Sequence, residues 1–545
     1  MLIRLKGGRV IDPAHDRDEI DDIWMQDGRI VARPPRGTEP DAVHDVSGKV
    51  VMAGGIDIHS HVAGGNVTLS RLLLPELHEG TEAPPEGQPF GTARWSSYET
   101  GRLYARMGFT TVVEPAVAPS QALQAHLELA DLPILDKATL SVLGNDEVLL
   151  GLMRDKAGRD AIADYVGLVV AKSRAIGVKC INAGGSAAFK DNVRTFGLDD
   201  VIPSYGLSSR QIFKALQQAV VDLRIRHPLH LHCNNLGVAG AIETLTETIE
   251  AADGLPLHLA HVQFYAYGRE GKRGFSSGAQ QLIRSLNLNP NVTVDVGQVM
   301  FGQTVTISSD SLRQYSAHAL ASPNKWIVWD GEGNGGGIVP FHYKASNVIN
   351  ALQWAIGLEI FLSAHDPWQV FFTTDHPNGA PFTTYPKILH LLMDRDERAR
   401  YIAGLPKAAM ALSALPSITR EFTLQEVAIM TRAAPARLLG LTDRGHLAPG
   451  SIADVSVYTD TADRTAMFER AALVFKDGHL VVRDGEVTEY RFGRAETVEP
   501  GFDKGIVRKI DGRLGDLYGT DTRQFTVPAG AIGRDEPFRV HPCRS

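Results

Sequence analysis

The middle of the chain alternates short apolar runs with longer segments of helical periodicity. Eight apolar runs occur between residues 50 and 374, and amphipathic segments such as Ser209–Arg224 and Gly237–Ala252 lie between them. This alternation is typical of β/α units that build a parallel sheet. Eight runs match the strand number of a TIM barrel, so the pattern predicts an α/β fold with a (β/α)8 barrel. The predicted strands are Val50–His59, Phe109–Glu114, Ala138–Val142, Gly177–Ile181, Pro228–His232, Pro256–His261, Val292–Val296 and Val370–Thr374.

The two ends of the chain follow a different pattern, in which apolar and polar residues alternate with a period of two. It is present in LIRLKGGRVID near the start and in GSIADVSVYT and AALVFKDGHLVVRDGEVTEYRF near the end. The pairs Asp477-Gly478 and Asp484-Gly485 are typical of hairpin turns. We therefore expect a small β-sandwich domain built from both chain ends, with residues 1–54 and 442–545 flanking a barrel at 55–441.

Two connections between predicted barrel strands are much longer than a simple β/α turn. One spans Val62–Gly91 and is rich in Gly, Pro and Glu, and the other is an insertion near residues 301–344. Because both follow barrel strands, we expect them to leave the catalytic face of the barrel and to enclose a substrate there. Neither contains a phosphate-binding glycine motif in the right context, which argues against nucleotide binding.

Composition excludes several classes of protein. Hydrophobic residues make up 43% and charged residues 22% of the 545 residues, which is ordinary for a globular protein and excludes a disordered chain. A net charge of -8 argues against a nucleic-acid partner. The sequence shows no apolar run of membrane-spanning length, no signal-peptide pattern at its start, and three cysteines without paired spacing. We therefore expect a cytoplasmic protein with no membrane partner.

The strongest chemical signal is the segment Asp57-Ile58-His59-Ser60-His61, directly after the first predicted strand. Residues two apart on a strand project to the same face, so His59 and His61 can converge on one point. Imidazole is a good ligand for zinc and similar divalent ions. A pair of polar loop histidines is the alternative that this segment alone leaves open.

Other ligand types lie at the ends of other predicted strands. His232 ends the fifth strand, His261 ends the sixth, and Asp375 follows the eighth in VFFTTDHPNG. Active sites of TIM barrels gather from several strand ends at one face. Any one of these residues can be an ordinary core side chain, but together they predict a metal site.

Lys179 lies near the end of the fourth predicted strand, in GVKCINAGG. A bare ammonium is costly to bury in an apolar strand. Reaction with CO2 to give a carbamate would turn this side chain into a carboxylate able to bridge two cations. We therefore expect a CO2-derived carbamate on Lys179.

Several residues beside these ligands have weaker signals. Asn182, Asn234 and Asn235 lie at loop starts, where they can bind polar groups of a substrate or simply cap turns. Cys180 and Cys233 alternate to the opposite strand face, so a packing role is expected for both. His230 shares the face of His232 one layer deeper, which favours a supporting or core role over ligation.

The chain resembles the amidohydrolase superfamily. The residues that carry this resemblance are the HxH segment after the first predicted strand and the Lys, His, His and Asp on later strands, namely His59, His61, Lys179, His232, His261 and Asp375. Within that superfamily, its sequence is most similar to the A-subunit family of formylmethanofuran dehydrogenases and to the corresponding subunits of bacterial formyltransferase/hydrolase complexes. The segments that carry the second resemblance are GGIDIHSHVAGGNV, GVKCINAGG, HLHCNNLG, HVQFYAYG and TTDHPNGAPF.

This resemblance implies a role for each predicted ligand. His59 and His61 would bind one divalent ion, His232 and His261 a second, and carboxylated Lys179 would bridge the two. Asp375 would be both a ligand and the general base. The metals are expected to be zinc, which would lower the pKa of water and polarise a formyl oxygen.

The resemblance also implies a reaction and partners. We expect hydrolysis of the formamide bond of a formylated methanofuran- or methylofuran-type C1 carrier, in a complex that includes a formyltransferase subunit. The chain has 16 Lys and 39 Arg, a bias that favours this bacterial hydrolase over its archaeal counterpart, which would condense formate with the carrier amine. A cyclic-amide hydrolase of the hydantoinase or dihydroorotase type is also compatible with the same metal ligands, and so is a scaffold subunit without activity.

Overall fold

The computed structural model describes residues 1–73, 97–193, 196–308 and 337–544. Its centre is a parallel sheet of eight strands that neighbour one another in chain order. The sheet curls, and its first and last strands meet: Ser60 and His376 form a parallel bridge, and Thr373 Oγ1 donates to the carbonyl of His59 at 2.7 Å. The expected barrel is confirmed. Its strands are β6 (Gly55–Asp57), β7 (Phe109–Val117), β8 (Asp136–Val142), β9 (Gly177–Ile181), β12 (Leu229–His232), β13 (Leu257–Leu259), β16 (Val292–Asp295) and β19 (Val370–Phe371).

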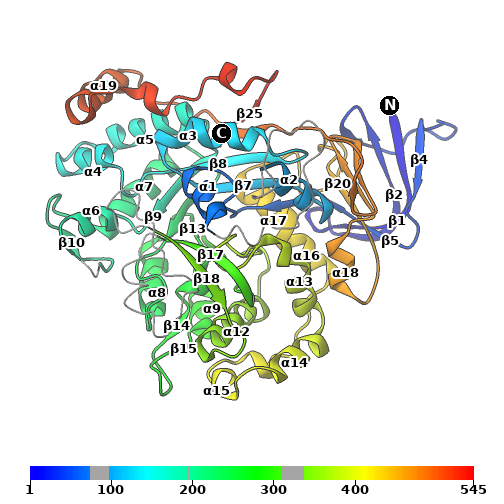
Figure 1. The fold of residues 1–545 in the computed structure, drawn as a ribbon. Helices are drawn as coiled ribbons and strands as arrows, with labels where there is room; N and C mark the ends of the chain where they lie inside the picture. The colour runs from blue at the N-terminus through cyan, green and yellow to red at the C-terminus, as the bar shows by residue number, and fades with distance from the viewer. Residues whose placement is uncertain (74–96, 194–195, 309–336, 545) are drawn as a thin grey trace.

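Helices follow the barrel strands and cover the sheet (Figure 1). The predicted helix at 209–224 is present as α7, where Ser208 and Gln211 form a capping box that fixes its first turn. None of the helices in these four stretches is both long and apolar enough to cross a membrane. The helices between the barrel strands are α2 (Ser97–Arg106), α3 (Ala122–Ala130), α4 (Glu147–Arg154), α5 (Arg159–Ser173), α6 (Gly185–Lys190), α7 (Ser209–Asp222), α8 (Ala241–Ala251), α9 (Ala279–Leu288) and α12 (Val348–Ser363), and those after β19 are α13 (Tyr385–Met393), α14 (Arg395–Ala403), α15 (Lys407–Met410), α16 (Leu424–Ala428) and α17 (Ala434–Leu439).

Strands from both chain ends form a second sheet beside the barrel (Figure 1). β5 pairs antiparallel with β20 and so joins the two ends, and buried residues such as Leu5, Val51 and Val455 share one core. Both Asp-Gly hairpin turns are present, with Asp477 and Asp484 at positive φ. The sheet contains β1 (Leu2–Asp12), β2 (Arg17–Gln26), β3 (Arg29–Val31), β4 (Ala42–Asp45), β5 (Lys49–Ala53), β20 (Val455–Thr459), β21 (Leu473–Lys476), β22 (His479–Arg483) and β23 (Glu486–Val487), with α18 (Arg464–Glu469) between β20 and β21.

The first predicted strand, Val50–His59, is two strands in the structure. β5 belongs to the terminal sheet and β6 to the barrel, and the chain passes between them at Gly54. A Cβ atom at Gly54 would lie 2.2 Å from Thr110 Oγ1, so only glycine allows this close approach to the neighbouring strand.

The end of the chain does not stay with the terminal sheet. β24 (Ala495–Val498) pairs in parallel with the start of β8, and β25 (Phe538–His541) pairs with β24, so both strands extend the barrel sheet at its N-terminal end. Between them α19 (Gly505–Tyr518) lies against α5 (Figure 1). The prediction that all of residues 442–545 form the sandwich and a tail is therefore wrong for this stretch. Its strands are short and carry polar residues, so the sequence pattern does not reveal them.

The two long connections pack against each other. α1 (Gly65–Leu72) follows the first barrel strand, and the hairpin β17–β18 (Gly302–Ser308 and Gly337–Tyr343) follows the seventh. Leu69 on α1 contacts an apolar cluster with Val305 and Ile338 of the hairpin. Residues 74–96 and 309–336, which include most of the predicted loop Val62–Gly91 and of the insertion, lie outside the described residues.

Candidate metal centre

His59 and His61 leave the end of β6 side by side and approach the carboxylate of Asp375. Their Nε2 atoms lie 3.1 and 3.2 Å from the same oxygen, Asp375 Oδ1. Neither contact has hydrogen-bond geometry, and Oδ1 has no hydrogen-bond partner in the described structure. Three ligand atoms that converge without sharing protons have the arrangement that one cation requires.

His232, His261 and Lys179 gather beside this group. The rings of His232 and His261 are 4.6 Å apart, and the ring of His261 lies 5.3 Å from that of His59. All three side chains are buried, and His232 Nε2, His261 Nδ1 and Lys179 Nζ have no hydrogen-bond partner among the described residues. A buried polar atom left unpaired costs about 1–3 kcal/mol, so several together indicate a binding partner outside the chain.

The local electrostatics favour metal binding at these atoms. Burial lowers the pKa of His232 well below its usual value and that of His261 to about 3, so both imidazoles are neutral, the form that binds metals. Burial alone would raise the pKa of Asp375, but the surrounding histidines, which include His59 and His61 at 3.1 and 3.2 Å, outweigh it and hold that pKa well below its usual range. Asp375 is therefore an anion beside the neutral imidazoles of His232 and His261. Burial opposes the charging of His61, but Glu114 and Asp375 outweigh it and raise the pKa of His61 to about 9, so this imidazole must give up a proton when a cation binds.

Two buried carboxylates orient the first pair of histidines. Glu114, at the end region of β7, lies 3.1 Å from His61 Nδ1, and its second oxygen accepts from the backbone N–H of Val62 and Ala63. Asp295, at the end of β16, lies 2.9 Å from His59 Nδ1. A proton on each Nδ1 leaves each Nε2 lone pair directed at Asp375. Neither carboxylate was predicted from the sequence. Both lie at or near the ends of predicted strands, and this position could have indicated that they belong to the site.

A second group of potential ligands, formed by His59, His230 and Asp295, lies one layer deeper. Here Asp295 Oδ2 is already engaged, at 2.9 Å from His59 Nδ1 and 3.1 Å from His258 Nε2. His230 Nε2 lies 3.2 Å from His59 Nδ1. Because protons shared among these atoms satisfy them, the deeper group is a support for His59, and the unpaired atoms around Asp375 fit a cation better.

Asp375 is held by the loop that follows β19. Asn378 Nδ2 donates to Asp375 Oδ2 at 2.9 Å, which leaves Oδ1 for the histidines. The other end of the same amide, Asn378 Oδ1, accepts from the backbone N–H of Ile307 on the hairpin at 2.6 Å. Asn378 therefore links the hairpin to Asp375, a connection that was not predicted from the sequence.

The three predicted substrate-binding asparagines surround the same face. Asn234 Nδ2 donates to Asn182 Oδ1 at 3.0 Å, and Asn234 Oδ1 accepts from Ser209 Oγ at 2.9 Å. Asn235 Nδ2 donates to Thr244 Oγ1 at 2.9 Å. These amides brace the loops after β9 and β12, and their predicted role toward a substrate stays a prediction. Cys180 and Cys233 are buried, and burial raises the pKa of each thiol.

Four residues at this face have a left-handed backbone conformation. Asn182, Asn235, His261 and Asp375 all have positive φ, at 42°, 68°, 36° and 52°. Non-glycine residues rarely adopt this conformation, and it persists where the surrounding structure enforces it, often at functional sites. His261 lies beyond the end of β13 at Leu259, so its own backbone conformation, and not the strand, sets the direction of its side chain.

Comparisons with known proteins agree with this geometry. A model described as the amidohydrolase family matches residues 42–488. The chain is 52% identical, over 100% of both sequences, to the A subunit of the formyltransferase/hydrolase complex Fhc of Methylorubrum extorquens, and 33% identical, over 94% of both, to protein FwdA of Methanocaldococcus jannaschii. Among solved structures, a chain of the FhcABCD complex of Methylorubrum extorquens with methylofuran superposes over 100% of both chains, with a TM-score of 0.95 and 51% identity.

Proposed function

The chain belongs to the amidohydrolase family, and we propose that it is the subunit of a formyltransferase/hydrolase complex that hydrolyses a formylated methanofuran- or methylofuran-type carrier to formate and the free amine. The observation that carries the proposal is the convergence of His59 Nε2, His61 Nε2 and the unpaired Asp375 Oδ1 at the strand ends of the barrel. The full-length likeness to a chain of such a complex supports the choice of substrate and partners.

The donor set fits two divalent ions. His59 and His61 would hold one, His232 and His261 the other, and Lys179 as a carbamate would contribute to both. Bound there, the ions supply Lewis acidity, which acidifies water and polarises a carbonyl. A site of neutral imidazoles and carboxylates is typical of zinc.

Asp375 moves the proton. Asn378 holds the carboxylate through Oδ2, and the Asp375 carboxylate accepts a proton from the attacking water. The new C–O bond forms as the C–N bond breaks, and the same carboxylate returns the proton to the departing amine nitrogen. The products are formate and the protonated carrier amine, so atoms and charge balance without a redox partner.

The substrate assay uses the intact, metal-replete complex. We expect formate release from the formylated carrier with a kcat/KM at least about 100-fold above that for hydantoin or dihydroorotate, because a site shaped for one polar substrate rejects others strongly. Chromatography measures both reactions, since it detects the formate released from the carrier and the ring-opened products of the cyclic amides. Faster turnover of the cyclic amides would overturn the assignment.

Asn378 offers a test of how Asp375 is positioned. Asn378→Leu removes the donor to Asp375 Oδ2 and should lower kcat by about 10–100-fold with a smaller change in KM, as expected for a partner of a ligating carboxylate. The matched control is Thr304→Val, since Thr304 Oγ1 donates from the same hairpin to Pro377 in the same loop without touching Asp375. Thr304→Val should keep near-normal kcat. Equal losses in both variants would assign the effect to loop stability instead.

A further inference from the structure

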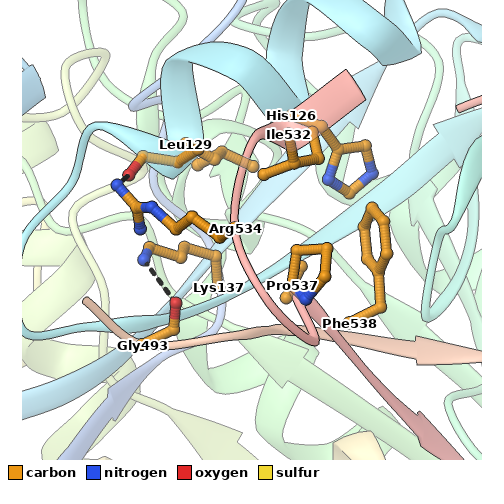
Figure 2. Close-up of a pocket in the computed structure, with 10 residues that line it drawn as sticks. His126, Leu129, Lys137, Gly493, Ile532, Arg534, Pro537 and Phe538 are labelled. Carbon is orange, nitrogen blue, oxygen red and sulfur yellow. Dashed lines mark hydrogen bonds between the residues drawn. The ribbon is translucent and has the colours of Figure 1, made fainter. Parts of the chain in front are cut away.

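A small pocket lies at the opposite end of the barrel from the metal centre. It is bounded by the start of β8 at Lys137, by His126 and Leu129 of α3, and by the C-terminal segment at Arg534 and Phe538 (Figure 2). Lys137 is the second residue of β8, whereas the predicted metal ligands lie at the other ends of the strands. The pocket therefore belongs to a different part of the molecule.

Two cationic side chains enter this pocket from adjacent walls. Lys137 is 2% exposed, and its Nζ donates to the carbonyl of Gly493 at 3.0 Å. Arg534 is half-buried, donates to the carbonyl of Ala130, and stacks on Phe492 with 4.0 Å between guanidinium carbon and ring centre. Figure 2 shows the two cationic groups next to each other. Within the described stretches of chain neither forms an ion pair with a carboxylate.

The neighbouring buried carboxylates are already paired with other cations. Asp136 Oδ2 lies 2.6 Å from Arg444 Nη1 and 3.1 Å from Lys476 Nζ. Glu496 lies 3.0 Å from Arg444 Nη2 and 3.2 Å from Arg539 Nη1. These contacts leave no acid for Lys137 and Arg534. A buried cation without a counter-charge is unfavourable, because desolvation is not repaid, and burial accordingly lowers the pKa of Lys137 to about 7. An anion bound beside it would stabilise the charged form.

Two further titratable groups lie near the cations. Burial lowers the pKa of His126 to about 4, so its imidazole is neutral, and it contacts the carbonyl of Ser173. Asp131 follows the C-terminus of α3, but it is exposed and forms no ion pair with either cation. His126 carries no charge, and Asp131 acts on Arg534 from the rim, without an ion-pair contact to either cation inside the pocket.

We propose that this pocket binds one small monovalent anion, of the size of chloride or a short carboxylate, between Lys137 and Arg534. The remaining N–H donors of the ammonium and the guanidinium would hold it, and apolar walls at Leu129, Ile532 and Phe538 limit its size and hydration. Because one wall comes from residues 493–495 and 532–538, the anion would fasten the C-terminal strands β24 and β25 to the barrel.

The first experiment measures the thermal stability of the full chain at constant ionic strength. Sodium chloride or sodium formate replaces sodium gluconate, whose anion is too large for the pocket. We expect the Tm to rise and then level off as the small anion saturates its site, since a ligand bound to the folded state stabilises it. The chloride and formate arms show which kind of anion binds more tightly.

Variants separate this site from general salt effects. Lys137→Met and Arg534→Gln should each abolish the saturable rise, whereas Lys504→Met, an exposed lysine in the same C-terminal segment, should keep it. Asp131→Asn should also keep the wild-type response. An equal response in wild type and Lys137→Met overturns the proposal. So does a response that appears only in Asp131→Asn, because Asp131 would then be the counter-ion.

A crystal of the complex grown with bromide locates the ion directly. We expect one anomalous peak between Lys137 Nζ and the Arg534 guanidinium. The absence of a peak overturns the proposal even if a variant fails to fold. A peak without any saturable change in Tm means binding at crystal concentration only, which overturns it as well.

Discussion

Lys179→Ala is expected to lose both bound metal and formate release. Lys179 is 1% exposed, its Nζ has no hydrogen-bond partner among the described residues, and it lies among the predicted ligands. Burial lowers the pKa of Lys179 to about 8, which increases the fraction of neutral amine that can add to CO2. The ammonium first loses one proton to give the amine, and addition of the amine to CO2 forms an N–C bond and releases a second proton, so that a costly ammonium becomes an anionic ligand. Without it, two cations would lack their shared anion.

Elemental analysis of bound metal and an assay of formate release test this prediction together. Metal-replete wild type should hold about two divalent ions per chain, and Lys179→Ala should hold far fewer. Lys179→Arg should not restore function, because a guanidinium cannot carry a carboxylate. Short carboxylic acids added to the alanine variant should restore part of both metal and activity.

The matched control is Cys180→Ala, the next residue along β9, which faces the other side of the strand and should keep metal and turnover. Retention of two ions and full activity by Lys179→Ala would contradict the carbamate role. An unmodified ammonium at Lys179 in a metal-replete crystal structure would do the same.

Much of the barrel could be predicted because its strands are continuous apolar runs, as parallel strands covered on both faces must be. Gly177–Ile181 was predicted with the bounds that the structure has. The pattern could not reveal the division at Gly54, because β5 and β6 are both buried and form one continuous apolar run. The division depends on the close approach of Thr110 to Gly54, which is a tertiary contact.

β24 was missed for a different physical reason. Its sequence, AETV, is short and carries a glutamate that is fully buried. The burial of Glu496 depends on Arg444 and Arg539, which come from other parts of the chain. A local sequence pattern cannot predict a strand whose buried polar residue is paired with residues from distant parts of the chain.

The site was predictable where strand geometry sets side-chain direction. His59 and His61 lie just beyond β6, which ends at Asp57, and their i, i+2 spacing still brings both Nε2 atoms to Asp375 Oδ1. Glu114 and Asp295 were not predictable in the same way, because they lie 53 and 236 residues from the histidines that they orient. Asn378 depends on the turn at Asp375, whose positive φ is a property of the folded loop.

Asp375→Asn is expected to abolish turnover while the complex still assembles. The amide has the shape of the carboxylate but cannot accept the proton of the attacking water, so formate release should fall by about 10²–10⁴-fold. The matched control is Asp366→Asn, an exposed aspartate just before β19, which should leave the rate unchanged. Size-exclusion chromatography checks assembly, and elemental analysis checks that ions are still bound.

Formate release from the formylated carrier by the assembled Asp375→Asn complex is therefore the most direct test of a metal-assisted formamide hydrolase at this barrel face. The expected result is release near background from a complex of normal size, beside wild-type rates for Asp366→Asn. Full formate release by the Asp375→Asn complex would contradict the proposed role of the site.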